Sequence, residues 1–450
     1  MLNQLPIQAI YLLTAVRLLL SSQSLPLRTT TSLGGDPACG LAWSRGGGYT
    51  FATWTVEPTI ESIIATLKTA IGINKEYDVR LLHKGASTKL YDVTFDNQAF
   101  VMRVSLPVCP RTKTEAEVAT LDWVIQHTPL PVPRVRAYDS SRDNPLGFEW
   151  ILMTKLEGTP LSQCWSSMTI GSKERLVKQI AAFAASTFDQ PFDDGIGSIF
   201  KAAPNSGGRA TVDHGRGPFS ETSDWMRSRL RAALSDLRSQ LIDDTTNENE
   251  KATLRHMSKL TRRIERLMPK FLPSSHETAS RETALGNAEC RPVMTMMKTM
   301  LCHDDLSFDN ILINDDGLLG GVIDWQWISC VPLYEACQFP VFLQQACDRF
   351  REPAGRFYLI DEDGPPHPAY FRDYKRYEVT KLRQLYIEEM LDRAPGFVDV
   401  WRDEASANLR DYEAVIQNCD NKFAISLVED WVEAIEQGRA PKRLHELLIR

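Results

Sequence analysis

The sequence lacks an apolar run long enough to span a membrane, and it lacks a block of basic residues. Its N-terminal apolar stretch, residues 5–20, carries Arg17 and falls short of the ~20 apolar residues of a transmembrane helix. The 450 residues carry a net charge of −7, which argues against nucleic acid as the main partner. We therefore expect no integral membrane segment and no nucleic-acid-binding surface.

Paired cysteines are also missing. The nine cysteines are scattered, and no two of them form a C-x-x-C pair. An odd, scattered set speaks against a disulfide framework or a zinc site and favours a reducing compartment. The chain contains no internal repeat, and at this length it can bury a large core, so we expect two lobes.

Acidic residues are absent from residues 1–35, where arginine, serine and threonine are present. This composition is typical of a mitochondrial transit peptide, whereas a secretory signal would place positive charge ahead of the apolar run. We therefore predict a targeting presequence and a mitochondrial location. A disordered tail on a cytoplasmic protein, or a misassigned start codon, is the alternative. The glycine-rich stretch from Asp36 to Gly48 is expected to be a linker.

A dense acidic motif, His303 to Asn310, is followed by a second acidic site at Asp324. Residues 311–323 read as strand, Asn-Asp-Asp-Gly turn and strand. Such a hairpin would fold Asp324 back beside Asp305 and Asn310. Phosphoryl transfer needs a cluster of this kind, because one carboxylate accepts the proton of the acceptor hydroxyl while an amide and a second carboxylate hold Mg²⁺ against the ATP phosphates.

The pattern H-x-D-L-x-x-x-N, a hairpin and then I-D-W resembles the aminoglycoside phosphotransferase and choline-kinase-like family. The resemblance covers roughly residues 80–440 and looks most like a fungal subgroup. It implies an α+β, bilobal, protein-kinase-like fold with a small β-rich N-lobe and a larger helical C-lobe. It assigns the catalytic base to Asp305 and the Mg²⁺ ligands to Asn310 and Asp324, while His303 would brace the loop rather than react. Taken alone, the motif could also be a solvated loop between two core strands.

The region before the motif predicts the β-rich lobe. A helical pattern runs from residue 60 to 70, and strands are expected at 79–82, 90–95 and 99–106. Between the first two strands, the turn with Gly85, Ser87 and Thr88 could offer backbone N–H groups to a triphosphate. This turn departs from the G-x-G-x-x-G loop of protein kinases, and any hairpin turn could look the same.

Arg103 occupies the place of the kinase strand lysine that holds the α- and β-phosphates. Its charge is permanent, but its planar fork does not superimpose on an ammonium group. Glu117, on a helix expected at 114–126, resembles the family's helix glutamate that pairs with the strand cation. Two ordinary surface charges are the alternative.

The strand expected at 148–153 enters the hinge between the lobes in this family. The resemblance therefore places Thr154, Lys155 and Leu156 along the adenine, where backbone groups can read the edge of the base. The sequence does not distinguish ATP from GTP. We divide the chain into an N-lobe, residues 36–155, and a C-lobe, residues 156–450, with a flexible insertion at 243–293.

The C-lobe is expected to be mainly helical. Helices are expected at 173–188, 224–241, 251–268, 371–391 and within 408–437. Three carboxylates could line a site for a cationic, hydroxyl-bearing acceptor: Glu388, Glu389 and Asp392. Three aromatic side chains could wall that site: Trp325, Trp327 and Tyr334. We favour a solvated helix face for the three carboxylates and ordinary core packing for the three aromatic side chains.

The sequence therefore predicts an enzyme that transfers the γ-phosphoryl group of ATP, with Mg²⁺, to a hydroxyl of a small molecule. No A-P-E motif follows Asp324, which leaves no room for an activation loop and speaks against a protein substrate. The alternative is a pseudokinase that binds nucleotide or a partner without catalysis, which Arg103 favours. Neither the acceptor nor an oligomeric state is indicated.

Overall fold

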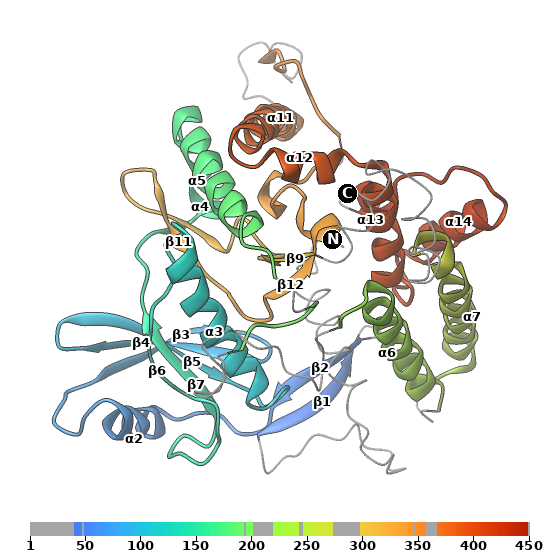
Figure 1. Cartoon of the computed structure of the whole chain (residues 1–450). Helices are drawn as coiled ribbons and strands as arrows, with labels where there is room; N and C mark the ends of the chain where they lie inside the picture. The colour runs from blue at the N-terminus through green and yellow to red at the C-terminus, as the bar shows by residue number, and fades with distance from the viewer. Residues whose placement is uncertain are drawn as a thin grey trace.

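The computed structural model describes residues 40–46, 49–192, 195–200, 219–242, 246–272, 298–345, 347–355 and 367–448. The predicted presequence, residues 1–35, lies outside these ranges. The described chain forms a β-rich N-lobe, at the lower left of Figure 1, and a helical C-lobe at the top and right. This arrangement confirms the expected α+β, bilobal, protein-kinase-like fold. None of the helices in the described ranges is long and apolar enough to cross a membrane.

The N-lobe is built on a five-stranded antiparallel sheet of order β3-β4-β5-β7-β6. Its elements are β1 (Leu41–Gly46), β2 (Tyr49–Trp54), α2 (Ile60–Ala70), β3 (Asp78–Lys84), β4 (Thr88–Phe95), β5 (Gln98–Ser105), α3 (Thr112–His127), β6 (Val135–Asp139) and β7 (Glu149–Thr154). The β4–β5 turn places Asp96 and Asn97 at φ +50° and +59°, and short polar side chains tolerate this left-handed geometry. Helix α3 packs against β6 and β7, and its Val118 joins a small core with Ile151 and Met153.

The expected linker at 36–48 is wrong where the structure describes it, because β1 pairs with β2 in an antiparallel hairpin. Leu41 and Ala52 join the N-lobe core, and the Trp54 ring lies 5.2 Å from the Phe148 ring.

The C-lobe carries the remaining elements. They are β8 (Thr159–Pro160), α4 (Leu161–Cys164), α5 (Ile170–Phe188), α6 (Thr222–Ile242), α7 (Glu248–Phe271), β9 (Thr299–Cys302), β10 (Ile311–Ile313), β11 (Leu319–Val322), β12 (Ser329–Pro332), α10 (Leu333–Ala336), η2 (Val341–Leu343), α11 (Pro368–Arg393), α12 (Pro395–Arg402), α13 (Glu404–Gln417), α14 (Ile425–Glu436) and α15 (Leu444–Leu448). Helices α5 and α11 lie side by side, linked by a buried Lys173–Glu378 ion pair of 2.8 Å. The five expected C-lobe helices are all present.

The expected flexible insertion, residues 243–293, is corrected in part. Residues 248–271 form helix α7, which packs against α6 and α13. Its buried side chains recur every three or four residues, so one face of the helix enters the core. The Tyr412 hydroxyl donates to the Ile264 carbonyl at 2.8 Å. Residues 273–297 lie outside the described ranges.

Candidate functional site

Two small antiparallel sheets hold the acidic motif. Strand β9 pairs with β12, while β10 pairs with β11 and β8. The loop after β9 and the segment after β11 therefore meet, and the Ile323 N–H donates to the Asn310 carbonyl at 3.0 Å. The predicted strand, turn, strand hairpin is confirmed, and it brings the two acidic sites to one place.

Asp305 and Asn310 contact each other directly. The Asn310 amide donates to Asp305 Oδ2 at 2.8 Å and to the Asp305 main-chain oxygen at 2.9 Å. Burial, and then the charge of Asp324, raises the pKa of Asp305 to about 6, against the hydrogen bonds that lower it. A carboxylate with such a pKa is ionised at neutral pH but holds a proton more readily than an exposed one, which suits a general base.

His303 supports this loop from the core side. Its Nε2 donates to the Ile323 carbonyl at 3.2 Å, and its ring stands edge-on to Trp325 with centroids 4.8 Å apart. The side chain is buried, and this burial lowers the pKa of His303 to about 4. A neutral imidazole that links two segments of the site has the contacts expected of a brace.

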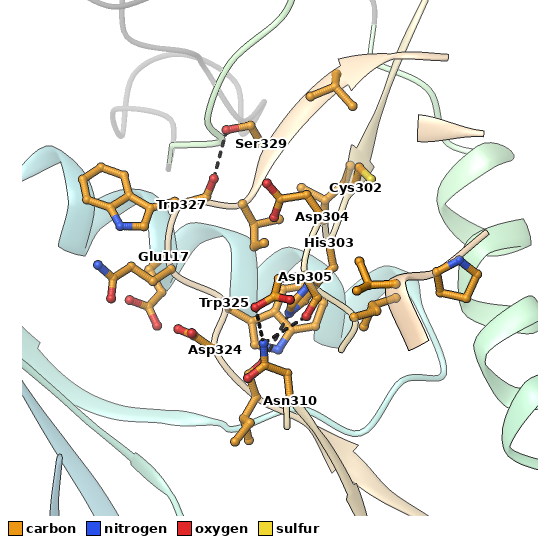
Figure 2. Close-up of a pocket in the computed structure, with 18 of the residues that line it drawn as sticks. Glu117, Cys302, His303, Asp304, Asp305, Asn310, Asp324, Trp325, Trp327 and Ser329 are labelled. Carbon is orange, nitrogen blue, oxygen red and sulfur yellow. Dashed lines mark hydrogen bonds between the residues drawn. The ribbon is translucent and has the colours of Figure 1, made fainter. Parts of the chain in front are cut away.

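Asp324 adopts φ +62°, a left-handed conformation that costs roughly 1–2 kcal/mol in residues other than glycine. Its carboxylate is 43% exposed and lies 3.5 Å from Arg103 Nη1. Figure 2 shows Asp324 between Glu117 and Asn310, with Asp305 nearby. The turn thus presents a carboxylate to the space between the two lobes.

Arg103 on β5 and Glu117 on α3 form a buried ion pair. Both side chains are less than a tenth exposed. Burial lowers the pKa of Arg103, an effect that the charge of Asp324 opposes. The structure therefore brings together the two N-lobe residues whose pairing was expected, and it adds Asp324 as a third member.

The turn between β3 and β4 is tight. The Gly85 N–H donates to the Thr88 carbonyl at 2.8 Å, and the Ser87 carbonyl accepts from the Leu106 N–H at 2.8 Å. The N–H of Gly85 is thus committed within the turn. Any contact that this turn makes with a phosphate must come from other N–H groups or from the two hydroxyls.

The hinge residues follow β7. The Thr154 hydroxyl accepts from the Arg134 N–H at 2.9 Å, and the Lys155 ammonium donates to Asp92 at 2.7 Å. Leu156 packs closely on β11, where a Cβ added to Gly321 would lie 2.4 Å from the Leu156 Cδ1. The hinge is therefore fixed between the sheet of one lobe and the hairpin of the other.

One cavity of about 1740 Å³ contains every residue that the sequence predicted for catalysis, nucleotide binding and Mg²⁺ binding. Its lining includes Gly85, Ser87, Thr88, Arg103, Glu117, Thr154, Lys155, Leu156, His303, Asp305, Asn310 and Asp324. These residues come from both lobes. The structure therefore brings these twelve residues together at one cavity.

The side chains that were considered for an acceptor site lie mostly outside the lining of this cavity. Glu389 binds Lys178 and Arg393, and neither it nor Glu388 or Asp392 belongs to the lining of this cavity. Tyr334 is fully buried and is also absent from that lining. Trp325, although it lines the cavity, is only 1% exposed and packs as core. Trp327 is half-buried and is the aromatic candidate that the cavity retains.

Four lining carboxylates were not predicted as site residues: Asp304, Asp309, Glu335 and Glu413. Asp304 is exposed to the cavity beside the base. Desolvation by the surrounding protein, and then the charge of Asp305, raises the pKa of Asp304 to about 7. The signal for Asp304 was its place inside the H-x-D motif. Nothing in the sequence marked Glu335, which α10 brings to the site.

The donors fit Mg²⁺ better than a metal that needs a protein cage. In the described part of the chain, no group of three or more His, Cys, Asp or Glu side chains could hold a metal ion. Asp324 and Asn310 offer one carboxylate and one amide oxygen. Mg²⁺ accepts such a small set of hard ligands, because it takes its other ligands from phosphates and water.

The sequence matches the model of the phosphotransferase enzyme family (APH) over residues 78–374. It is 27% identical to a subtelomeric hrmA-associated cluster protein of Aspergillus fumigatus, over 59% of this chain and 60% of that protein. The chain thus spans less than two thirds of that relative's length. It is 21% identical to altered inheritance of mitochondria protein 9, mitochondrial, of Candida glabrata, over 86% of this chain and 69% of that protein. These relatives confirm the expected fungal subgroup.

Among solved structures, the aminoglycoside phosphotransferase APH(4)-Ia is similar to this chain with a TM-score of 0.43 and 14% identity. The match covers 85% of this chain and 100% of that one. A similarity at 14% identity does not indicate a substrate for this chain.

Proposed function

The chain belongs to the phosphotransferase enzyme family, and from this premise we propose that it transfers the γ-phosphoryl group of ATP to a hydroxyl of a small molecule. One observation carries the proposal: the acidic loop, the carboxylate after β11 and the Arg103–Glu117 pair meet in one cavity between the lobes. In this proposal residues 36–155 serve as the nucleotide-binding N-lobe, and residues 156–450 as the C-lobe that carries the loop, the metal site and the acceptor site.

Asp305 acts as the general base in this proposal. The Asn310 amide donates to Asp305 Oδ2 at 2.8 Å, and this bond orients the carboxylate for the acceptor hydroxyl. The raised pKa strengthens the base while the hydroxyl loses its proton. His303 keeps the loop in register with the segment before Asp324.

Asn310 and Asp324 are the proposed Mg²⁺ ligands. A bound Mg²⁺ would neutralise charge on the phosphates of ATP. The chain's own contribution is to hold both oxygens on one rigid hairpin, since catalysis of this kind is mostly positioning and charge stabilisation. Arg103 is the proposed phosphate clamp, and Glu117 orients it.

The remaining predicted residues are proposed to bind the nucleotide. The β3–β4 turn, with Gly85, Ser87 and Thr88, covers the phosphates. Residues 154–156 bind the nucleobase of the nucleotide, because their backbone joins the two lobes along the cavity.

The acceptor is proposed to be a small molecule rather than a protein. Strand β12 begins at Ser329, only a few residues after Asp324, and α10 follows directly. This connection leaves no segment on which a peptide substrate could be aligned. Asp304, next to Asp305 in the chain, and Glu335 are lining carboxylates that are proposed to face the acceptor.

A pseudokinase is the second candidate, and one contact favours it. Arg103 Nη1 lies 3.5 Å from Asp324, so the cation competes with Mg²⁺ for a proposed ligand. A protein that only binds nucleotide or a partner could keep this contact permanently. A phosphotransferase must loosen it when Mg²⁺ and ATP bind.

Transfer of label from γ-³²P-ATP to small molecules extracted from fungal cells separates the two candidates. We expect a labelled small-molecule product with the wild-type chain. Asp305→Asn should lower the rate by about 10²–10⁴-fold, because it removes the base. Lack of any product from a wild-type protein that binds ATP would favour the pseudokinase.

A mitochondrial location is also proposed, with a cytoplasmic location as the alternative. The support is the relative named as a mitochondrial protein, at 21% identity, together with the acid-poor composition of residues 1–35. The test is to fractionate cells that express the chain with a C-terminal tag. Recovery of the tag in cytosol alone would contradict this part of the proposal.

A further inference from the structure

Lys113 is a buried cation without a charged partner. It lies in the first turn of α3, one turn before Glu117 and on the same helix face. Its side chain is 4% exposed and lines the cavity, and its Nζ has no hydrogen-bond partner within the described chain. Burying an ammonium group is unfavourable unless an anion joins it, so its position needs a reason.

The other cations of the cavity are already engaged. Arg103 pairs with Glu117, and Lys155 with Asp92. Arg229 pairs with Glu413, and Arg410 donates to two main-chain carbonyls. Among the lysines and arginines of this lining that the structure describes, Lys113 is therefore the one whose charge is not committed to the protein.

Glu149 is the carboxylate whose charge acts most strongly on Lys113, and it already accepts hydrogen bonds from other groups. Glu149 accepts from the Thr114 hydroxyl at 2.7 Å and from the Arg111 N–H at 2.9 Å. Its charge acts on Lys113 only from a distance. Burial lowers the pKa of Lys113 to about 8, so the group stays mostly protonated at neutral pH.

Two further donors line the cavity in the segment directly after Asp324. The Gln326 Nε2 and the Trp327 Nε1 are buried and have no hydrogen-bond partner among the described residues. Both side chains line the cavity, and Lys113 Nζ lies 5.8 Å from the centre of the Trp327 ring. Figure 2 shows Trp327, Glu117 and Asp324 on the same side of the cavity. Lys113, Gln326 and Trp327 thus line the cavity with three donors that have no partner among the described residues, and such donors favour a bound anion.

We propose that Lys113 binds the terminal phosphate of the nucleotide, with the side-chain N–H groups of Gln326 and Trp327 as additional donors. This inference rests on the proposed function. Phosphate is the anion that the reaction brings into this cavity, and the free donors directly follow Asp324 in the chain. The flexible four-carbon stem of lysine allows the ammonium to turn from the Trp327 ring toward the phosphate.

The role of Lys113 in the transfer follows from its charge. The bond between the γ-phosphorus and the β–γ bridging oxygen of ATP breaks, and ADP leaves with that oxygen and its electron pair. A bond from the γ-phosphorus to the acceptor oxygen forms. The acceptor proton passes to Asp305. Lys113 stabilises the charge on the oxygens of the moving phosphoryl group, which Arg103 cannot do alone while Glu117 and Asp324 share its guanidinium.

Calorimetric titration of the whole chain, in Mg²⁺, with ADP and with the slowly hydrolysed ATP analogue AMP-PNP tests the proposal. Lys113→Met should weaken AMP-PNP binding at least about tenfold, as expected for a lost charged hydrogen bond, and ADP binding by no more than about twofold. The melting temperature of the nucleotide-free variant should stay the same or rise, because an unpaired buried charge is gone.

Lys173→Met is the matched control, because Lys173 is buried to a similar degree but is paired with Glu378 far from the nucleotide. It should lower the melting temperature and leave the ratio of the two affinities unchanged. An equal loss of both nucleotides in Lys113→Met, or no loss, would overturn the inference alone. A wild-type chain that binds neither nucleotide would overturn the proposed function and this inference together.

Discussion

Arg103 connects three parts of the molecule through one side chain. It lies on β5, pairs with Glu117 on α3 and contacts Asp324 after β11. Because Arg103 and Glu117 are both buried, water cannot compensate the charge of either one if the other is lost. This residue therefore contributes to folding and to the proposed nucleotide site, and the two contributions need separate tests.

We predict that Arg103→Met lowers the free energy of unfolding by about 3–5 kcal/mol, because it leaves Glu117 buried without a cation. The double variant Arg103→Met/Glu117→Leu should recover most of this loss, since an apolar pair can replace a buried ion pair. Urea denaturation of both variants provides the measurement. A double variant as unstable as the single one would contradict the account, and recovered stability without ATP binding would separate the two contributions.

The sequence indicated which residues lie close together only where a motif with a fixed spacing related them. Asp305, Asn310 and Asp324 were found because their spacing marks a loop and a hairpin. The sequence did not single out the cavity-lining Lys113 and Glu335, because neighbours far away in the sequence decide which side chains reach a cavity wall.

The junction of β8 with β10 connects the hinge to the acidic hairpin. Gly158, just before β8, has φ +134°, and a Cβ there would lie 2.8 Å from the Ile313 carbonyl oxygen. We predict that Gly158→Ala destabilises the protein by at least about 1–2 kcal/mol, through backbone strain and this contact. Thermal denaturation measures the loss.

Gly171→Ala in α5 is the matched control for this prediction. No atom lies within 4 Å of a Cβ placed there, so the change should be neutral or stabilising by up to about 1 kcal/mol. Equal effects of the two substitutions would contradict the assigned role of Gly158.

Helix α15 is attached to α13 through Asp411. This carboxylate accepts from Arg443 Nη1 at 3.1 Å, from the His445 N–H at 3.1 Å and from His445 Nδ1 at 2.6 Å. Burial alone would raise the pKa of Asp411, but the hydrogen bonds and the charges of these two partners outweigh it and lower that pKa. The folded state therefore binds the proton less tightly than the unfolded state.

A lowered pKa stabilises the fold above the unfolded pKa of an aspartate, near 4, and the stabilisation is lost as the pH falls through the folded pKa. We predict that Asp411→Asn costs about 1–3 kcal/mol at pH 7 and much less at pH 3. Denaturant titrations at the two pH values measure the difference. The exposed Asp430→Asn should stay within about 0.5 kcal/mol at both, and a cost of Asp411→Asn that does not depend on pH would contradict the argument.

Elements were predictable where local chemistry decides them. Helix α2 has the predicted bounds because its apolar residues recur on one face, and the β4–β5 turn follows from Asp96 and Asn97. The β1–β2 hairpin was missed, because its glycines resemble those of a linker and its strands are stabilised by side chains of the distant sheet.

At the scale of the whole molecule, the site exists only when both lobes are folded. The N-lobe contributes the Arg103–Glu117 pair and the β3–β4 turn, and the C-lobe contributes the base and the proposed metal ligands. The Val322 N–H donates to the Pro131 carbonyl at 2.9 Å, which fixes the N-lobe connection between α3 and β6 to the acidic hairpin of the C-lobe. ATP bound in this cavity would therefore stabilise the two lobes together.

The most direct test of the central claim is the melting temperature of the chain with ATP, with and without Mg²⁺, beside Asp324→Asn and Asp316→Asn. Asn tolerates the left-handed backbone at position 324 as Asp does, and Asp316 is an exposed carboxylate of the same hairpin's turn. Ligand at a hundred times its dissociation constant adds about 2.7 kcal/mol. We predict a Mg²⁺-dependent rise that Asp316→Asn keeps and Asp324→Asn loses. No rise with ATP, or an equal rise in all three proteins, would contradict the account.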